Sequence, residues 1–420
     1  MNSLPQQRTC YDDEDEGHVI KHKRVRGGAL MLAVAVGVMG GGLPGTAAAT
    51  TAGTTAARST HTADDARLRA LMHRLTTADG APGALVATRD GRGSSVLTSG
   101  VADVGSRASV RGDSRFRIGS MTKPFVATVV LQLVGQGCVD LDAPVERYLP
   151  GVVRGHGNDG RVITVRMLLQ HTSGLPDYLD HLDPRDILGD PLAHHDTRDL
   201  VNLALAHPPT FEETGAKPGS EWHYSNTNYL LAGMLIEKVT GHAYGEEIRR
   251  RVIEPLGLHD TSVPGDATSI PGPHPRGYVR PGEDAPLVDI TAFNPSVAGA
   301  SGEMISSGAD LNRFLDALVR GKLLRPAQLK EMMTTRPTGG DDDRAYGLGL
   351  ESRTLRCGGG LYWGHGGDVF GYQTAGGATA DGRQATVMTN VDPGGPDAQD
   401  DDMESAVQAG LCQGRPAHSR

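Results

Sequence analysis

Residues 117–134 read RIGSMTKPFVATVVLQLV, a short polar turn that leads into an apolar run with helical spacing. Pro124 is tolerated near the start of such a helix because first-turn N–H groups have no intrahelical acceptor. Ser120 and Lys123 stand three residues apart, so both side chains lie on one helical face. An amine beside a serine hydroxyl can serve as its general base, and a helix N-terminus offers backbone donors to an oxyanion. Ser120 is therefore a candidate nucleophile; the alternative is a capping serine beside a solvated lysine.

A second polar cluster, PGSEWHYSN at residues 218–226, precedes another apolar helical pattern at 230–239. Tyr224 and Asn226 are two residues apart, so the phenol and the amide can face one cavity. Tyr224 can relay a proton if neighbouring cations lower its pKa from the ordinary value of about 10, and Asn226 can hold a substrate amide. The alternative is a buried tyrosine with a capping asparagine.

A third cluster, WGHGGD at residues 363–368, has the pattern of an edge strand. Its glycines, Gly366 and Gly367, would let another backbone approach closely. His365 would lie on this strand as a proton donor or as a cation.

The rest of the chain supplies helices in its middle and strands towards both ends. We expect one helix at 65–75 and several helices between 161 and 255. Short strands bordered by Gly or Asp are expected at 83–88, before a hairpin turn, and at 346–350, 361–364, 372–376 and 384–390. This order predicts an α+β fold, in which an antiparallel sheet joins N- and C-terminal segments, is flanked by helices and surrounds a mostly helical insertion.

Composition places the chain among globular proteins and excludes some partners. With 420 residues, 38% of them hydrophobic, it can bury a sizeable core. A formal charge of −9 has the wrong sign for a protein held on phosphates, so no nucleic acid is expected. His194 and His195 beside Asp196 lack the H-E-x-x-H spacing of a zinc site, and the acidic runs at 341–343 and 400–402 lack calcium-loop spacing. We expect neither a metal nor an organic cofactor.

The N-terminus has the order of a secretory signal: four basic residues between 21 and 26, an apolar stretch at 29–43, and alanines at 47–49. The apolar stretch is glycine-rich and shorter than the roughly 20 residues that span a bilayer, which favours cleavage near Ala49 over an anchor. We expect a signal peptide at 1–49, a linker at 50–63, one folded domain at 64–412, a disordered tail at 413–420, and a secreted protein. An uncleaved membrane anchor is the alternative.

The cysteines add a covalent constraint. Cys10 would leave with the signal, so Cys138, Cys357 and Cys412 remain in a compartment where disulfides form. An odd number leaves one of them unpaired. We pair Cys357 with Cys412 because that bridge would tie down the C-terminal segment and because Cys138 lies in an apolar segment. The alternative is three buried thiols.

S-x-x-K, Y-x-N and H-x-G, in this order in one chain, resemble the motifs of the serine penicillin-recognising family: class C β-lactamases, D-alanyl-D-alanine carboxypeptidases and related esterases. The resemblance covers about residues 65–412 and includes 117–123, 141–151, 163–166, 171–175, 226–229 and 346–350. It implies the β-lactamase/transpeptidase fold. A histidine that opens the third motif is most similar to soluble, secreted D-alanyl-D-alanine carboxypeptidases, and Cys357 and Cys412 fall where such enzymes are expected to place a disulfide.

The resemblance also implies catalytic roles. Ser120 would attack a carbonyl to form an acyl-enzyme, while Lys123 and Tyr224 move protons and His365 tunes Tyr224 electrostatically. The oxyanion would lie between the backbone N–H groups of Ser120 and Asp368. Water or an acceptor amine would then release the acyl group.

Substrate binding would fall to Asn226, Gly366 and Gly367. The implied partners are peptidoglycan stem peptides, other small acyl substrates and β-lactams, and we expect a monomer. All four catalytic side chains, those of Ser120, Lys123, Tyr224 and His365, are present. An active hydrolase therefore ranks ahead of a catalytically silent penicillin-binding sensor, and a carboxypeptidase is the first choice among hydrolases.

The chain departs from the carboxypeptidase pattern at the carboxylate site. Such enzymes use a hydroxyl inside H-T-G and an arginine on the preceding strand, but here the first position is Gly366 and the second falls near Glu351. Arg353 and Arg356 lie close by in the sequence. An acidic residue there would repel a free C-terminal D-alanine, so an esterase or amidase, or a class C-type β-lactamase, is the alternative.

Overall fold

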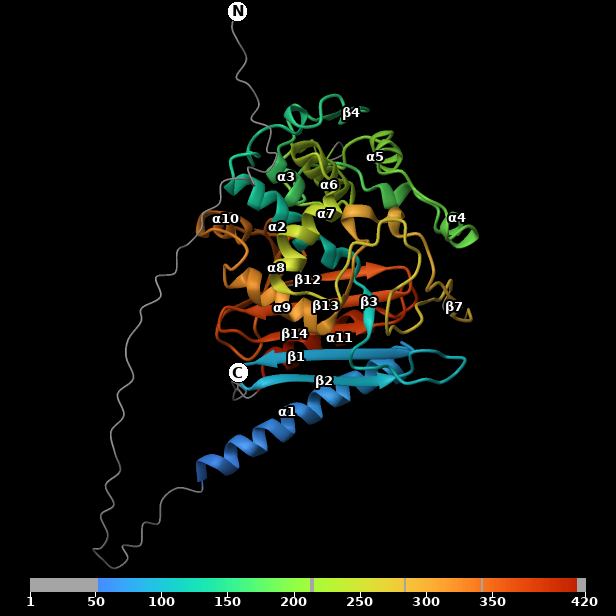
Figure 1. The fold of residues 1–420 in the computed structure, drawn as a ribbon, viewed down its shortest axis with the longest axis vertical. Coiled ribbons are helices and arrows are strands. Elements are labelled where there is room, and N and C mark those ends of the chain that lie inside the picture. The colour runs from blue at the N-terminus through green and yellow to red at the C-terminus, as the bar shows by residue number, and fades with distance from the viewer. Residues whose placement is uncertain (1–51, 212–214, 283–284, 341–342, 414–420) are drawn as a thin grey trace, which may run out of the picture.

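The computed structural model describes residues 52–413, apart from 212–214, 283–284 and 341–342. Figure 1 shows a central sheet with helix α1 running along one side and most of the other helices gathered at the opposite end. The expected signal peptide at 1–49 and residues 414–420 of the expected tail lie outside the described residues.

The central sheet is antiparallel throughout and has eight strands in the order β2-β1-β14-β13-β12-β11-β10-β9. N- and C-terminal segments meet between its second and third strands, where Ala84 of β1 pairs with Thr389 of β14. This confirms the predicted α+β arrangement. The strands are β1 (Gly83–Asp90), β2 (Gly93–Gly100), β9 (Arg336–Pro337), β10 (Ala345–Tyr346), β11 (Glu351–Thr354), β12 (Leu361–Val369), β13 (Tyr372–Thr379) and β14 (Gln384–Thr389).

Both faces of the sheet are covered, which explains the nearly unbroken apolar run in β1. Leu85 and Ala87 pack into the large core shared with the helical part. Ala84 and Val86 point the other way, into a second core formed with α1 (Ala52–Thr77) and α11 (Asp397–Leu411). The alternation follows from the two-residue period of a strand.

The helical part lies between β2 and β9 in the sequence. Its central helix is α2, whose side chains from Thr122 to Leu131 are all buried, so the S-x-x-K motif is anchored at the centre of the molecule. The helices are α2 (Thr122–Gly135), α3 (Val165–Leu169), α4 (Pro184–Gly189), α5 (Thr197–Leu205), α6 (Thr227–Thr240), α7 (Tyr244–Ile248), α8 (Glu254–Leu256), α9 (Gly308–Val319) and α10 (Pro326–Met332).

Three two-stranded ribbons complete the fold. They pair β3 (Arg115–Arg117) with β8 (Ile305–Ser307), β4 (Arg154–Gly155) with β5 (Asn158–Asp159), and β6 (Tyr278–Val279) with β7 (Val288–Asp289). The β3–β8 ribbon immediately precedes the short 3-10 helix η1 (Gly119–Met121), which carries Ser120 into α2.

Three local expectations are wrong. Helix α1 begins at Ala52 rather than at residue 65. Residues 347–350 form a turn closed by the Gly347 N–H and the Leu350 carbonyl, so β10 ends at Tyr346. Strand β12 is interior rather than an edge strand, although β11 pairs only with its first half, Leu361–Gly364. None of the described helices has the length and apolar character needed to cross a bilayer.

Cys357 and Cys412 form the predicted disulfide, which joins the β11–β12 connection to the end of α11 across 55 residues. The expectation that one cysteine stays unpaired is wrong, since no described cysteine is a free thiol.

Removing this bridge is expected to destabilise the fold. In the Cys357→Ser/Cys412→Ser double variant the unfolded chain regains the entropy of a loop of 55 residues, so the free energy of unfolding should fall by about 4 kcal/mol. Urea unfolding of wild type and variant measures the difference. A change smaller than about 1 kcal/mol would show that the bridge constrains the unfolded chain little.

Candidate active site

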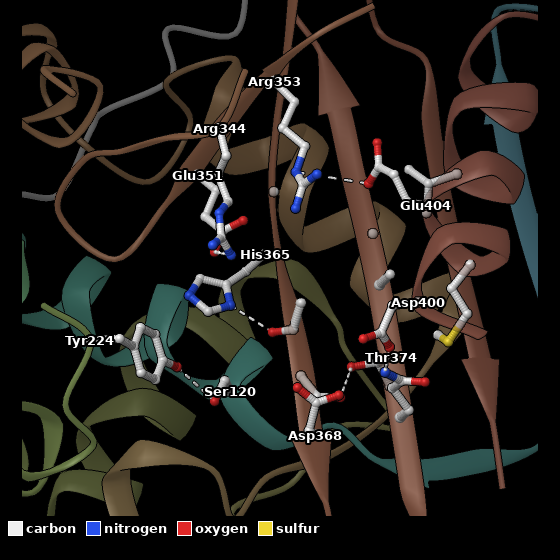
Figure 2. A pocket seen from close by; sticks show the side chains of 18 of the residues that line it. Ser120, Tyr224, Arg344, Glu351, Arg353, His365, Asp368, Thr374, Asp400 and Glu404 are labelled. Carbon is white, nitrogen blue, oxygen red and sulfur yellow. Dashed lines mark hydrogen bonds and ion pairs between the residues drawn. The ribbon is translucent and has the colours of Figure 1, made fainter. Parts of the chain in front are cut away.

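The three sequence motifs meet in one cavity of about 680 Å³. Ser120 comes from η1, Tyr224 and Asn226 precede α6, and His365 lies on β12 (Figure 2). The cavity therefore forms where the central helix, the helical insertion and the half-paired strand of the sheet adjoin.

Ser120 stands between two proton-carrying groups. Lys123 Nζ lies 2.8 Å from Ser120 Oγ, and Tyr224 Oη donates a hydrogen bond to the same oxygen at 2.9 Å. The helical spacing of Ser120 and Lys123 thus places the amine beside the hydroxyl as predicted. The site geometry is that of a nucleophile with an adjacent base.

Lys123 is fully buried, which excludes the solvated lysine of the alternative interpretation. Besides Ser120, its amine contacts Asn226 Oδ1 at 2.7 Å and the Ser301 carbonyl at 2.8 Å. Burial lowers the pKa of Lys123 to about 7, although nearby carboxylates, Asp177 foremost, favour the charged form. At neutral pH a substantial fraction of the amine is therefore neutral and has a lone pair.

Tyr224 is a neutral phenol, because burial raises its pKa well above the usual value and the carboxylates of Glu351 and Asp368 raise it further. Its hydrogen bond with Ser120 lowers this pKa, but by less than burial raises it. The expectation that cations lower the pKa of Tyr224 is wrong. Tyr224 is a hydrogen-bond donor in the resting site.

His365 is also neutral, so its expected role as a cation that tunes Tyr224 is wrong. Burial lowers the pKa of His365 to about 3, and the neighbouring Lys123 lowers it further. Its Nδ1 lies 2.6 Å from the Gly366 carbonyl, which requires a proton on Nδ1, so Nε2 accepts from Tyr346 Oη at 2.9 Å. Both ring nitrogens of His365 are therefore engaged in hydrogen bonds within the protein.

Asn226 connects the amine to a buried carboxylate. While its Oδ1 accepts from Lys123, its Nδ2 and backbone N–H donate to Asp177 Oδ2 at 2.8 and 2.9 Å. Asn226 therefore holds the Lys123 amine in place and links it by hydrogen bonds to the carboxylate of Asp177. It also lines the cavity, and its contact with a substrate amide stays a prediction.

Glycines bring the two predicted oxyanion donors together. Gly119 has a positive φ of 49°, and a Cβ there would lie 2.6 Å from the backbone nitrogen of Asp368. A Cβ at Gly367 would lie 2.1 Å from the Ile118 carbonyl. The backbone that carries Ser120 thus runs directly against β12 at Asp368, where an oxyanion between their N–H groups is predicted.

Four carboxyl side chains line the cavity: Glu351, Asp368, Asp400 and Glu404 (Figure 2). Although the Asp368 side chain is exposed to the cavity, desolvation by the surrounding protein raises its pKa to about 6, and the nearby Asp400 contributes to this shift. Arg344 and Arg353 face the same space (Figure 2). Each lies near a carboxylate: Arg344 Nη1 is 3.8 Å from Glu351, and Arg353 Nε is 3.9 Å from Glu404.

Asp177, Ser301 and Tyr346 belong to the site but escaped the sequence-based search. Asp177 and Ser301 lie in short irregular segments, and Tyr346 was assigned only to a strand. No local spacing marks them, because each acts on a motif residue that is distant in sequence. In the described part of the chain, no three histidine, cysteine or acidic side chains are placed to hold a metal ion.

Comparisons with known proteins agree with this geometry. The family model named Beta-lactamase matches residues 66–410. A solved D-stereospecific amidohydrolase from a Streptomyces species is 41% identical with a TM-score of 0.74, over 84% of this chain and 98% of that one. The D-amino acid amidase of Ochrobactrum anthropi SV3, solved with L-phenylalanine amide, is 30% identical with a TM-score of 0.70, over 83% and 98%.

Among curated proteins, penicillin-binding protein 4 of Amycolatopsis lactamdurans is 30% identical over 254 residues, 60% of this chain and 63% of that protein. The chain therefore spans less than two thirds of that relative. The match to the family model, by contrast, includes all three motifs. With Ser120, Lys123 and Tyr224 assembled as described, the chain is a serine hydrolase of the beta-lactamase family.

Proposed function

We propose that this protein hydrolyses amides and esters of small acyl groups, amides of D-amino acids above all, through an acyl-enzyme on Ser120. The leaving group of the preferred substrate carries no carboxylate. The Streptomyces D-stereospecific amidohydrolase and the Ochrobactrum D-amino acid amidase support this substrate class, because both align over nearly their whole length.

The observation that carries the proposal is the position of Glu351. It pairs with Gly364 across β11 and β12, directly before His365, and its side chain lines the cavity. A substrate carboxylate in this part of the cavity would meet Glu351 together with Asp368, and like charges at close range are unfavourable. A neutral amide or a cationic substrate avoids this repulsion.

Lys123 is the general base of the proposed mechanism. As a neutral amine it donates two hydrogen bonds, to Asn226 Oδ1 and the Ser301 carbonyl, and these leave its lone pair directed at Ser120 Oγ. Ser120 then passes its proton to Lys123 as Oγ attacks the carbonyl carbon. Backbone N–H groups of Ser120 and Asp368 stabilise the oxyanion.

Tyr224 is the general acid for the leaving group. Its Oη donates to Ser120 Oγ in the resting site, so it lies beside the nitrogen that departs from the tetrahedral intermediate. The phenol gives its proton to that nitrogen and recovers one from the Lys123 ammonium, since both groups contact Ser120 Oγ in the resting site. Water then attacks the ester carbonyl and gives a proton to Lys123. As the bond between the acyl carbon and Ser120 Oγ breaks, Lys123 returns this proton to Oγ, and the acid is released.

The D-alanyl-D-alanine carboxypeptidase activity expected from the resemblance ranks second. It needs a cation for the substrate carboxylate, and both arginines of the cavity already lie near carboxylates: Arg344 near Glu351 and Arg353 near Glu404. The proposed hydrolase is also secreted after removal of residues 1–49, is a monomer and binds β-lactams.

The first test compares substrates that differ in the leaving group. We expect kcat/KM for D-alaninamide and D-phenylalaninamide to exceed that for a D-alanyl-D-alanine peptide by on the order of tenfold or more, equivalent to about 1.4 kcal/mol of carboxylate repulsion. Product release is followed by chromatography, with Ser120→Ala as the inactive control. Faster turnover of the peptide would instead establish a carboxypeptidase.

Glu351→Gln tests the charge argument directly. Removing this carboxylate should raise kcat/KM for the D-alanyl-D-alanine peptide by roughly threefold to tenfold and leave D-alaninamide turnover within about twofold. Glu331→Gln, at an acidic residue that pairs with Arg166 outside the cavity, is the matched control. An equal change for both substrates would contradict a role of Glu351 in selecting the leaving group.

The pH dependence tests the base. Protonated Lys123 has no lone pair, so kcat/KM should rise with pH through a midpoint at about 7, the value to which burial lowers the pKa of Lys123. Because the pKa of Tyr224 is raised, its ionisation should cause no fall below about pH 10. A rate that is flat between about pH 5.5 and about pH 8.5 would contradict Lys123 as the base.

A further inference from the structure

His171 has an unusual backbone for a residue outside the described catalytic set. Its φ is +55°, a left-handed value that a non-glycine residue adopts rarely and at a cost. The side chain is completely buried. A strained conformation at a buried position persists only where the surrounding contacts require it, so those contacts are informative.

Three contacts of His171 fall on consecutive residues around the general acid, in addition to ring contacts with Trp222, Tyr229 and Tyr346. Its carbonyl accepts from the His223 N–H at 2.8 Å, and its Nδ1 accepts from the Ser225 N–H at 3.2 Å. Between these two, its ring stacks on the ring of Tyr224, with centroids 4.2 Å apart and planes at 26°. The left-handed backbone thus lets His171 contact the ring of Tyr224 and, at the same time, hydrogen-bond to the residues before and after Tyr224.

The hydrogen bonds also define the tautomer of His171. Ser173 Oγ donates to Asn228 Oδ1 at 2.6 Å, which turns Asn228 Nδ2 towards His171 Nδ1 at 3.2 Å. With the Ser225 amide as a second donor, Nδ1 can only be an acceptor, so the proton is on Nε2. Burial and the nearby Lys123 lower the pKa of His171 well below its usual value, and the ring stays neutral beside the catalytic amine.

We propose that His171 is a positioning residue that fixes the ring of Tyr224, so that its hydroxyl stays within hydrogen-bond reach of Ser120. It touches neither the nucleophile nor the reacting atoms and acts through Tyr224. This inference rests on the acyl-enzyme mechanism of the proposed function but not on the identity of the acyl group.

His171→Asn isolates the stacking contact. Asparagine tolerates a positive φ better than most residues, and its side-chain oxygen can accept from the Ser225 amide, but it offers no ring. We expect kcat for D-phenylalaninamide to fall about tenfold to a hundredfold with KM changed less than about threefold. Hydrolysis of p-nitrophenyl acetate, whose leaving group needs no proton, should fall less than the amide reaction.

A double-mutant cycle separates positioning from a general structural effect. In a Tyr224→Phe background there is no hydroxyl to misplace, so His171→Asn should change the residual turnover of D-phenylalaninamide by less than about twofold. His207→Asn removes an imidazole that stacks on His181 at 3.4 Å and is the matched control, expected to retain wild-type kcat. An equal loss from His171→Asn with and without the Tyr224 hydroxyl would overturn the proposal.

Two further measurements keep the outcomes distinct. Thermal unfolding checks the fold of His171→Asn; if it is unfolded, Asn228→Ala, which removes one donor to Nδ1, should show a smaller loss of kcat in the same direction. If that variant folds and keeps full activity, the proposal is wrong.

Wild-type turnover is measured first: failure to hydrolyse any amide or ester counts against the proposed function, whereas additive losses in the cycle count against His171 alone.

Discussion

The burial of the Lys123 amine is the constraint on which the site depends. An ammonium without water is costly, and the protein meets that cost with three acceptors and a buried carboxylate, Asp177, behind Asn226. These partners come from η1, the segment before α6 and the 3-10 turn at Ser301. Catalysis and folding are therefore coupled, because the amine reaches its acceptors only when the helical insertion has packed on α2.

The surroundings of Ser120 divide by charge. On one side lie groups that burial keeps neutral: Tyr224, His171 and His365, all of them aromatic. On the other side the cavity wall carries carboxylates. A proton can pass between Lys123, Ser120 and Tyr224 without creating a second isolated charge, while the carboxyl groups face the space that a substrate would occupy.

The sequence predicted what depends on local spacing. S-x-x-K, Y-x-N and H-x-G were placed on a helix start, a turn and a strand, and the structure brings them together. Ionisation states were mispredicted at Tyr224 and His365, because desolvation depends on the tertiary packing around each ring. Asp177 and Ser301 were missed for the same reason, since nothing near them in sequence indicates which amine they serve.

Errors in the fold have a similar origin. Strand β12 was expected at an edge where its glycines let another backbone approach, yet the short β11 pairs with half of it. The start of α1 was placed too late, because the composition of a segment does not by itself locate the first residue of a helix.

The pairing of β1 with β14 affects how the chain can assemble. The β1–β2 hairpin is made first during synthesis, yet the partner of β1 arrives about 300 residues later. Until then one edge of the hairpin is open, and contacts between such distant segments form slowly. The strand that carries His365 also belongs to this late C-terminal part. The nucleophile is thus present long before the sheet that completes its cavity, so an unfinished chain carries Ser120 without the means to use it.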